Sequence, residues 1–86
     1  MKKSLLCGYL ERRIGMMSYS LNYDAETGNA QLLVLSEAFE GRKLYSRKLK
    51  LGKRLHKSQL AWVLGSYQKE ALAQASNCVM QLTGLR

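Results

Sequence analysis

The residues with the clearest chemical potential are the lysines and arginines of one segment, RKLYSRKLKLGKRLHK, residues 42–57. This basic segment holds eight of the chain's 14 Lys and Arg residues and no acidic residue, and His56 can add partial positive charge. The eight candidate contact residues are Arg42, Lys43, Arg47, Lys48, Lys50, Lys53, Arg54 and Lys57. Closely spaced cations bind nucleic acid because each phosphate they neutralise releases condensed counterions. An acidic protein surface is the other partner that such a segment fits.

The charge of the whole chain is unbalanced in the same direction. Lys and Arg number 14 and Asp and Glu number 6 in 86 residues, which gives a formal net charge of +8. Five of the six acids precede position 41, and Glu70 follows it. A run of charge is often only a solvated face, or an edge strand protected against unwanted pairing. Because the basic segment has eight cations and no acidic residue, its composition favours the binding interpretation.

The residue types that catalysis needs are sparse. His56 is the single histidine, and it has no metal-ligand spacing to Cys7 or Cys78. Cys78 falls on an apolar helical stripe, where thiols are usually inert. The carboxylates are few and scattered, and neither GxxxxGK[ST] nor GxGxxG occurs. We therefore expect no enzyme, no metal and no cofactor.

The length bounds the architecture to one small domain, residues 1–86. A chain of this size buries only about 60% of its unfolded surface, so a homodimer interface would add to a thin stability margin. The start, MKKSLLCG, resembles a secretion signal, but charge returns at Glu11, and no stretch approaches the roughly 20 apolar residues of a membrane span. We expect a cytoplasmic protein with reduced thiols and no membrane contact.

Period-two alternation predicts three strands. Residues 16–23 and 30–36 flank a hairpin loop at 24–29, and Glu40-Gly41 provides the turn before a third strand at 42–51. In this last strand Lys48 and Lys50 share one face, while Leu44 and Arg47 break the alternation and predict a bulge or an edge position. Tyr19, Tyr23 and Tyr45 have the parity of the core face, which favours burial over stacking on bases.

Period-3.6 spacing predicts a long C-terminal helix of about 24 residues. Its stripe is Leu60, Leu64, Tyr67, Ala71, Ala75, Cys78 and Leu82. Ser58 is the expected N-cap and Gly84 the expected C-terminal glycine, with Gly65-Ser66 and Ser76-Asn77 as places where the helix can kink. Trp62 flanks the stripe, and we expect it in the core rather than as a partner contact.

Residues 4–14 fit a short helix or a strand, and the strand is favoured because an isolated two-stranded hairpin is marginal in water. The predicted fold is α+β, with an antiparallel β-meander of three to four strands packed against one long C-terminal helix. The predicted function is non-catalytic nucleic-acid binding through the basic segment. The alternative is a small phage-type interaction or inhibitor protein, similar in size to anti-CRISPR inhibitors, that docks its basic face on a host protein or nucleoprotein complex.

Overall fold

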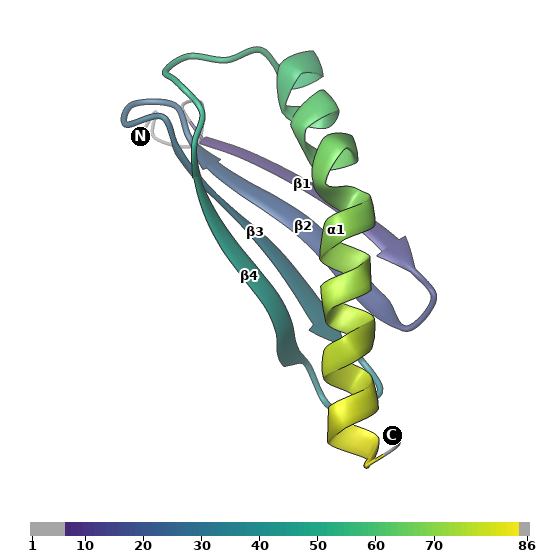
Figure 1. Cartoon of the computed structure of the whole chain (residues 1–86). Coiled ribbons are helices and arrows are strands. Elements are labelled where there is room, and N and C mark those ends of the chain that lie inside the picture. Colours follow the sequence, from purple (N-terminus) through teal and green to yellow (C-terminus); the bar gives the residue numbers. More distant parts are fainter. Residues whose placement is uncertain (1–6, 85–86) are drawn as a thin grey trace.

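The computed structural model describes residues 7–84, which form four strands followed by one helix (Figure 1). The elements are β1 (Cys7–Ile14), β2 (Met17–Asp24), β3 (Asn29–Ser36), β4 (Arg42–Lys50) and α1 (Lys57–Thr83). All neighbouring strands pair antiparallel in the order β1-β2-β3-β4, so the sheet is a meander with β1 and β4 at its edges. The predicted α+β fold, with one long C-terminal helix, is confirmed.

β1 resolves the ambiguity at the start of the chain in favour of a strand. It pairs with β2 in continuous register from Cys7 opposite Asp24 to Ile14 opposite Met17. This partner satisfies the backbone groups along one edge of β2 and turns a marginal hairpin into part of a four-stranded sheet. Residues 4–6, the first part of the predicted strand, lie outside the described residues.

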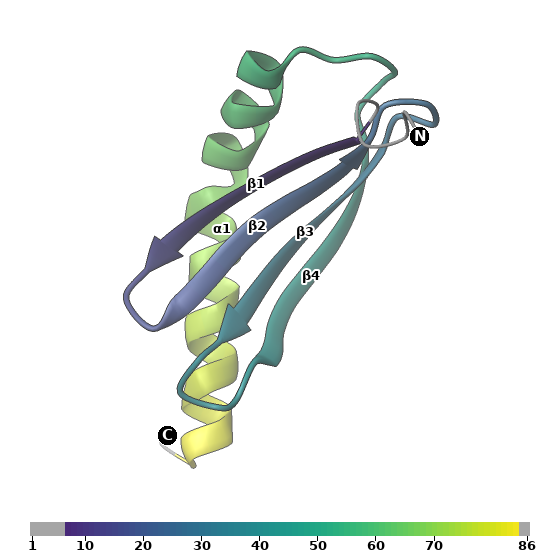
Figure 2. The same ribbon diagram turned by 180° about the vertical axis from the view of Figure 1, so that it is seen from behind.

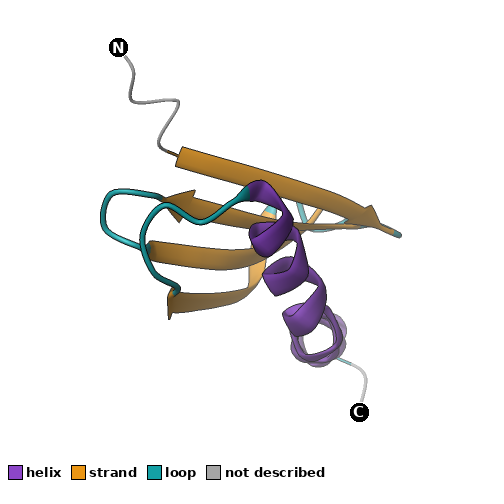
Figure 3. Ribbon diagram, turned by 90° about the horizontal axis from the view of Figure 1, so that it is seen from above, coloured by secondary structure: helices purple, strands orange, loops and turns teal. Residues whose placement is uncertain are grey.

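α1 covers one face of the sheet and leaves the other face uncovered. The helix lies in front of the strands in Figure 1 and behind them in Figure 2, and the view from above in Figure 3 shows it on one side only. The core between sheet and helix contains Tyr19, Tyr23, Leu32, Val34, Leu60, Leu64, Ala71 and Ala75, among others. Tyr19 and Tyr23 are buried and Tyr45 is half-buried against this core, so the predicted core parity of the three tyrosines is confirmed.

The hydroxyls of two buried tyrosines form hydrogen bonds from the sheet to the segments that follow it. The Tyr19 hydroxyl donates to the Leu64 carbonyl oxygen of α1 at 2.5 Å. The Tyr23 hydroxyl donates to the Gly52 carbonyl oxygen at 2.5 Å and accepts from the Leu55 N–H at 3.1 Å. Tyr23 therefore holds the connection between β4 and α1 at two points, which sets the path of the basic segment after β4.

Arginines from the two edge strands also reach the helix. Arg12 of β1 donates to the Gln68 side chain, and Arg47 of β4 donates to the Glu70 carboxylate at 2.6 Å. The two acceptors are two residues apart on α1. Each edge of the sheet thus has its own polar contact with the same stretch of helix, beside the apolar core.

The ends of α1 differ in part from the expectation. His56, rather than Ser58, is the N-cap: its ring nitrogen accepts from the Ser58 N–H at 3.3 Å, and its own N–H donates to the Gln59 side chain at 2.8 Å. This reciprocal pair places the start of the helix two residues earlier than predicted. Gly84 ends the helix with a φ of 81°, as expected, because a left-handed residue suits glycine.

The body of α1 is a single helix of 27 residues that continues through Gly65-Ser66 and Ser76-Asn77. Neither pair interrupts it, and the Ser66 hydroxyl donates back to the Trp62 carbonyl oxygen at 2.8 Å. Nowhere in residues 7–84 does a helix combine the length and the apolar character needed to cross a membrane.

Trp62 is not in the core, so that expectation was wrong. Its side chain is 73% exposed. At 100° per residue it lies roughly 200° around the helix from Leu60, which is buried under the sheet. Val63, beside the apolar stripe, is buried, whereas the Trp62 side chain faces outward.

The predicted irregularity in β4 is a bulge. Tyr45 lies opposite Val34 and Lys43 lies opposite Leu35, so Leu44 is the extra residue, and it is buried in the core. Beyond the bulge the alternation is regular, with Lys48 opposite Gln31 and Lys50 opposite Asn29 on the face away from α1.

The β2–β3 hairpin holds the end of β4 through Gly28. The Gly28 carbonyl oxygen accepts from the Leu51 N–H at 2.8 Å and, more weakly, from the Gly52 N–H at 3.4 Å. Gly28 has a φ of 82°, and a Cβ atom there would lie 2.9 Å from the carbonyl carbon of Gly52. The close approach of the two backbones requires a glycine at this position.

Replacing Gly28 tests this contact, with Gly15 as the matched control. Gly15 has a φ of 62° and nothing near the position of its Cβ, so Gly15→Ala incurs only the left-handed penalty of about 1–2 kcal/mol. Gly28→Ala adds a backbone clash and should lower the free energy of unfolding by at least about 1 kcal/mol more. Urea denaturation measures both, and equal losses would show that the two backbones do not constrain each other.

Burial makes the Tyr19 hydroxyl a weaker acid than an ordinary tyrosine, and this can be tested at alkaline pH. Burial, together with the nearby Tyr45, raises the pKa of Tyr19 to about 12. Between pH 10, where an unfolded tyrosine ionises, and pH 12, the folded state holds more protons than the unfolded state, so stability falls as pH rises. Tyr19→Phe should be less stable than the parent at pH 8, with a deficit that narrows as pH rises from 10 towards 12. Urea midpoints of both proteins across this pH range measure how their stability depends on pH. If the two proteins lose stability in parallel, the raised pKa of Tyr19 would be contradicted.

Candidate nucleic-acid interface

The face of the sheet that α1 does not cover, called here the open face, is mostly polar. The register places on it Tyr9, Glu11 and Arg13 from β1; Ser18, Ser20, Asn22 and Asp24 from β2; Asn29, Gln31, Leu33 and Leu35 from β3; and Lys43, Ser46, Lys48 and Lys50 from β4. Polar residues dominate because a one-helix fold leaves this face in water.

The structure does not gather the eight predicted cations into one cluster. All eight are exposed, but they divide among three places. Lys43, Lys48 and Lys50 project on the open face, Arg42 and Arg47 have the parity of the helix side, and Lys53, Arg54 and Lys57 lie in the connection and at the first residue of α1. Strand alternation causes this division, since successive side chains of β4 point to opposite faces.

Arg47 is engaged within the protein. Its guanidinium forms an ion pair with Glu70 at 2.6 Å and lies over the Tyr67 ring, 5.2 Å from the ring centroid. The nearby Tyr45 hydroxyl and the Glu70 carboxylate raise the pKa of Arg47 further above its usual range. The Tyr45 hydroxyl also donates to Glu70 at 3.3 Å, and burial raises the pKa of Tyr45. Arg47 therefore joins β4 to α1, and it is the one of the eight cations that has a carboxylate partner in the described residues.

The other seven cations have no carboxylate within ion-pair distance in the described part of the chain. The two ion pairs found there are Arg47–Glu70 and Arg13–Glu37, the latter at 2.6 Å. Lys48 and Lys50 are two residues apart on an edge strand, about 6.6 Å along its length. Their charges remain available to an external anion.

The connection after β4 extends these cations towards the helix. Arg54 has a φ of 53°, and its N–H donates to the Ala25 carbonyl oxygen at 3.1 Å, which pins the loop to the β2–β3 hairpin. Lys53 and Lys57 are exposed on either side of it. The first turn of α1 contains no acidic residue, so the positive end of the helix dipole is not neutralised by a side chain there.

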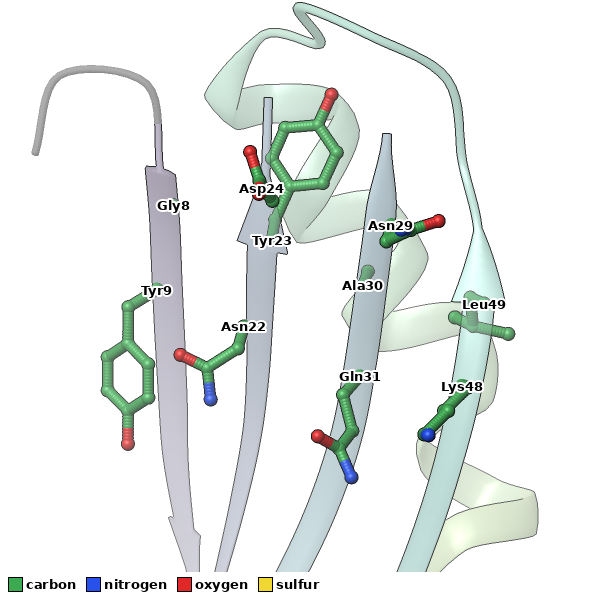
Figure 4. Close-up of a pocket in the computed structure, with 10 residues that line it drawn as sticks. All are labelled: Gly8, Tyr9, Asn22, Tyr23, Asp24, Asn29, Ala30, Gln31, Lys48 and Leu49. Atoms are coloured by element: carbon green, nitrogen blue, oxygen red, sulfur yellow. The ribbon is translucent and has the colours of Figure 1, made fainter. Parts of the chain in front are cut away.

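A hollow of about 730 Å³ lies over the end of the sheet where β4 finishes (Figure 4). Its lining includes Tyr9, Asn22, Asp24, Asn29, Gln31 and Lys48. Sequence reasoning singled out Lys48 but missed Tyr9, Asn22 and Gln31. Tyr9 can be recognised as a candidate residue when residues 7–14 are treated as a strand paired with β2, because Tyr9 then lies on the same face as Asn22.

A smaller hollow of about 390 Å³ lies beside the first turns of α1. It is lined by Leu51, Leu55, Gln59, Trp62 and Val63 and is largely apolar. Elsewhere in residues 7–84 no three His, Cys, Asp or Glu side chains come together in a way that could hold a metal ion. Cys78 is a half-buried free thiol.

Comparisons of the chain with protein-family models, with curated proteins and with solved structures found no match.

The separate roles of two adjacent residues of β4 can be tested through stability. Arg47→Gln removes an ion pair and a ring contact with α1, so it should lower the urea midpoint of unfolding. Lys48→Gln removes an exposed charge with no partner in the described chain and should leave the midpoint unchanged. A midpoint for Arg47→Gln that equals that of the parent would show that Arg47 does not fasten the helix.

Proposed function

We propose that this protein is a non-catalytic nucleic-acid-binding module that contacts phosphates through β4 and the connection that follows it. The contact residues are Lys43, Lys48 and Lys50 on the open face, Lys53, Arg54 and Lys57 beyond it, and Arg42 at the start of the strand. Arg47, which the sequence pattern also suggested, serves instead to hold α1 to the sheet. The observation that carries the proposal is that seven exposed cations of β4 and the connection have no carboxylate partner in the described residues.

The arrangement suits a polyanion better than a single small anion. From Lys43 to Lys50 the cations of the open face extend over about 23 Å, and the connection prolongs the path to the start of α1. A polymer can neutralise its phosphates along such a path one after another, and each contact adds a counterion-release term to the binding free energy. Lysines on an edge strand also discourage pairing with another sheet, and this role is compatible with phosphate binding. A cytoplasmic location belongs to the same proposal.

A protein partner is the second candidate, and Trp62 favours it. Tryptophan is enriched among the residues that dominate protein interfaces, and this one is 73% exposed beside an apolar hollow. In this case the protein is a small interaction or inhibitor module of the phage type. After nuclease treatment, a stoichiometric protein partner that Trp62→Ala releases would support the second candidate over the first.

Charge reversal on β4 tests the nucleic-acid proposal. Lys48→Glu combined with Lys50→Glu should abolish oligonucleotide binding, because two attractive contacts become repulsive on the face where the phosphates are held. The single change Lys48→Gln should reduce the slope of log affinity against log salt by about 0.7 for single strands and about 0.9 for duplex. Fluorescence anisotropy with labelled oligonucleotides over a salt series measures both.

Lys69→Gln provides the matched control, since Lys69 is an exposed lysine of α1 outside the basic segment. It changes the net charge by the same amount and should leave the salt slope nearly unchanged. Binding that ignores salt and survives the double reversal would contradict the proposal.

A further inference from the structure

We infer that the open face binds single-stranded nucleic acid across the four strands, with an unpaired base stacked on Tyr9. The inference rests on the proposed function, and it adds the form of the ligand and a base-contacting residue outside the basic segment. It is carried by one row of side chains, called here the cross-strand row. Its members, in order from β1 to β4, are Tyr9, Asn22, Gln31 and Lys48.

The cross-strand row is set by the register of the sheet. Tyr9 lies opposite Asn22, Asn22 opposite Gln31, and Gln31 opposite Lys48, so the four side chains share the open face. With strands about 4.8 Å apart, the row extends about 14 Å from edge to edge. Figure 4 shows the four side chains on successive strands, with α1 behind the sheet, and all four line the 730 Å³ hollow.

Tyr9 supplies an aromatic surface that the core tyrosines cannot. Its side chain is 56% exposed, whereas Tyr19 and Tyr23 are buried beneath α1. The Tyr9 hydroxyl donates to the Glu11 carboxylate at 3.4 Å, and the Ser18 hydroxyl donates to the other oxygen of the same carboxylate at 2.6 Å. This chain of contacts orients the ring over β1 and leaves it accessible. An exposed aromatic ring on a sheet is a stacking surface for any unpaired base.

The middle of the row carries the groups that recognise base edges. Gln31 donates its side-chain N–H to the Ser46 hydroxyl at 2.8 Å, which leaves its carbonyl oxygen as an acceptor. Asn22 is exposed, with an amide that can donate and accept. Amides bond base edges well, and here they lie between the stacking ring and the lysine.

Charge sets the direction in which the ligand crosses the sheet. On the open face Lys43, Lys48 and Lys50 all lie on β4, while the acidic residues Glu11 and Asp24 lie on β1 and β2. Arg13, the cation that β1 places on the open face, forms an ion pair with Glu37. Phosphates are therefore attracted to the β4 edge and repelled from the β1 edge. Because the row spans about 14 Å, which is more than one nucleotide covers, the phosphate held at Lys48 and the base stacked on Tyr9 belong to different nucleotides of a strand that crosses the sheet.

The geometry selects a single strand over a duplex. In a duplex the faces of the bases are stacked on one another, so none can stack on Tyr9 without leaving the helix. A single strand offers unpaired bases together with phosphates for β4. Duplex binding through the lysines alone would not involve Tyr9.

Three variants and three ligands test the inference by anisotropy. The ligands are a dT oligonucleotide, an abasic oligonucleotide of the same length, and a duplex. Tyr9→Ala should weaken dT binding by about 5- to 150-fold, the range that loss of one stacked base produces. It should leave the salt slope and the affinities for duplex and abasic ligand unchanged, because no phosphate contact is lost. Tyr9→Phe keeps the ring and should bind dT within about threefold of the parent, and Lys48→Gln should lower the salt slope on all three ligands.

The outcomes separate this inference from the proposed function. If Lys48→Gln lowers the salt slope while Tyr9→Ala binds dT as the parent does, the base-stacking role is overturned and the phosphate-binding function stands. If Tyr9→Ala weakens the binding of all three ligands equally, the substitution acts through the structure of the sheet, and the stacking role is also overturned. If the parent binds none of the ligands, both are overturned. The same series with a U oligonucleotide reports whether RNA or DNA binds more tightly.

Discussion

The packing of one helix against one face of the sheet is the constraint on which the rest of the structure depends. α1 buries apolar residues of β2, β3 and β4 and partly covers those of β1. The hydroxyls of Tyr19 and Tyr23 bond the helix and the connection before it to β2. Arg12 and Arg47 add a contact from each edge of the sheet. Because the described residues contain no second layer, most side chains of the opposite parity face water.

This constraint gives neighbouring cations different roles. Arg47 and Lys48 are adjacent in sequence, yet one faces Glu70 and Tyr67 on α1, and the other faces outward beside Gln31. The guanidinium suits its place, since a planar cation can pair with a carboxylate and lie over a ring at once. The lysines of the open face are compact, hydrated charges on flexible chains, which suits phosphate contacts that do not depend on sequence.

The open face combines features that a solvated surface does not need. Cations lie on β4, amides lie on the central strands, and an exposed aromatic ring lies on β1, oriented by Glu11. This arrangement is the one on which the proposed binding of single-stranded nucleic acid rests.

The sequence by itself determined the strand and helix periods, the turn glycines, the core parity of Tyr19 and Tyr23 and the net positive charge, because these depend on local spacing and composition. For the strand around Leu44 it left a bulge or an edge position open, and the structure has both. Tertiary structure alone decided which cations stay available, since Arg47 meets Glu70 only when α1 folds back over β4. It also decided the exposure of Trp62, which depends on where the sheet lies around the helix, and the place of Tyr9, whose neighbours are fixed by the register of β1 against β2. Contacts between residues far apart in the chain depend on how the helix and the edge strand pack on the rest of the sheet, and local spacing does not specify this packing.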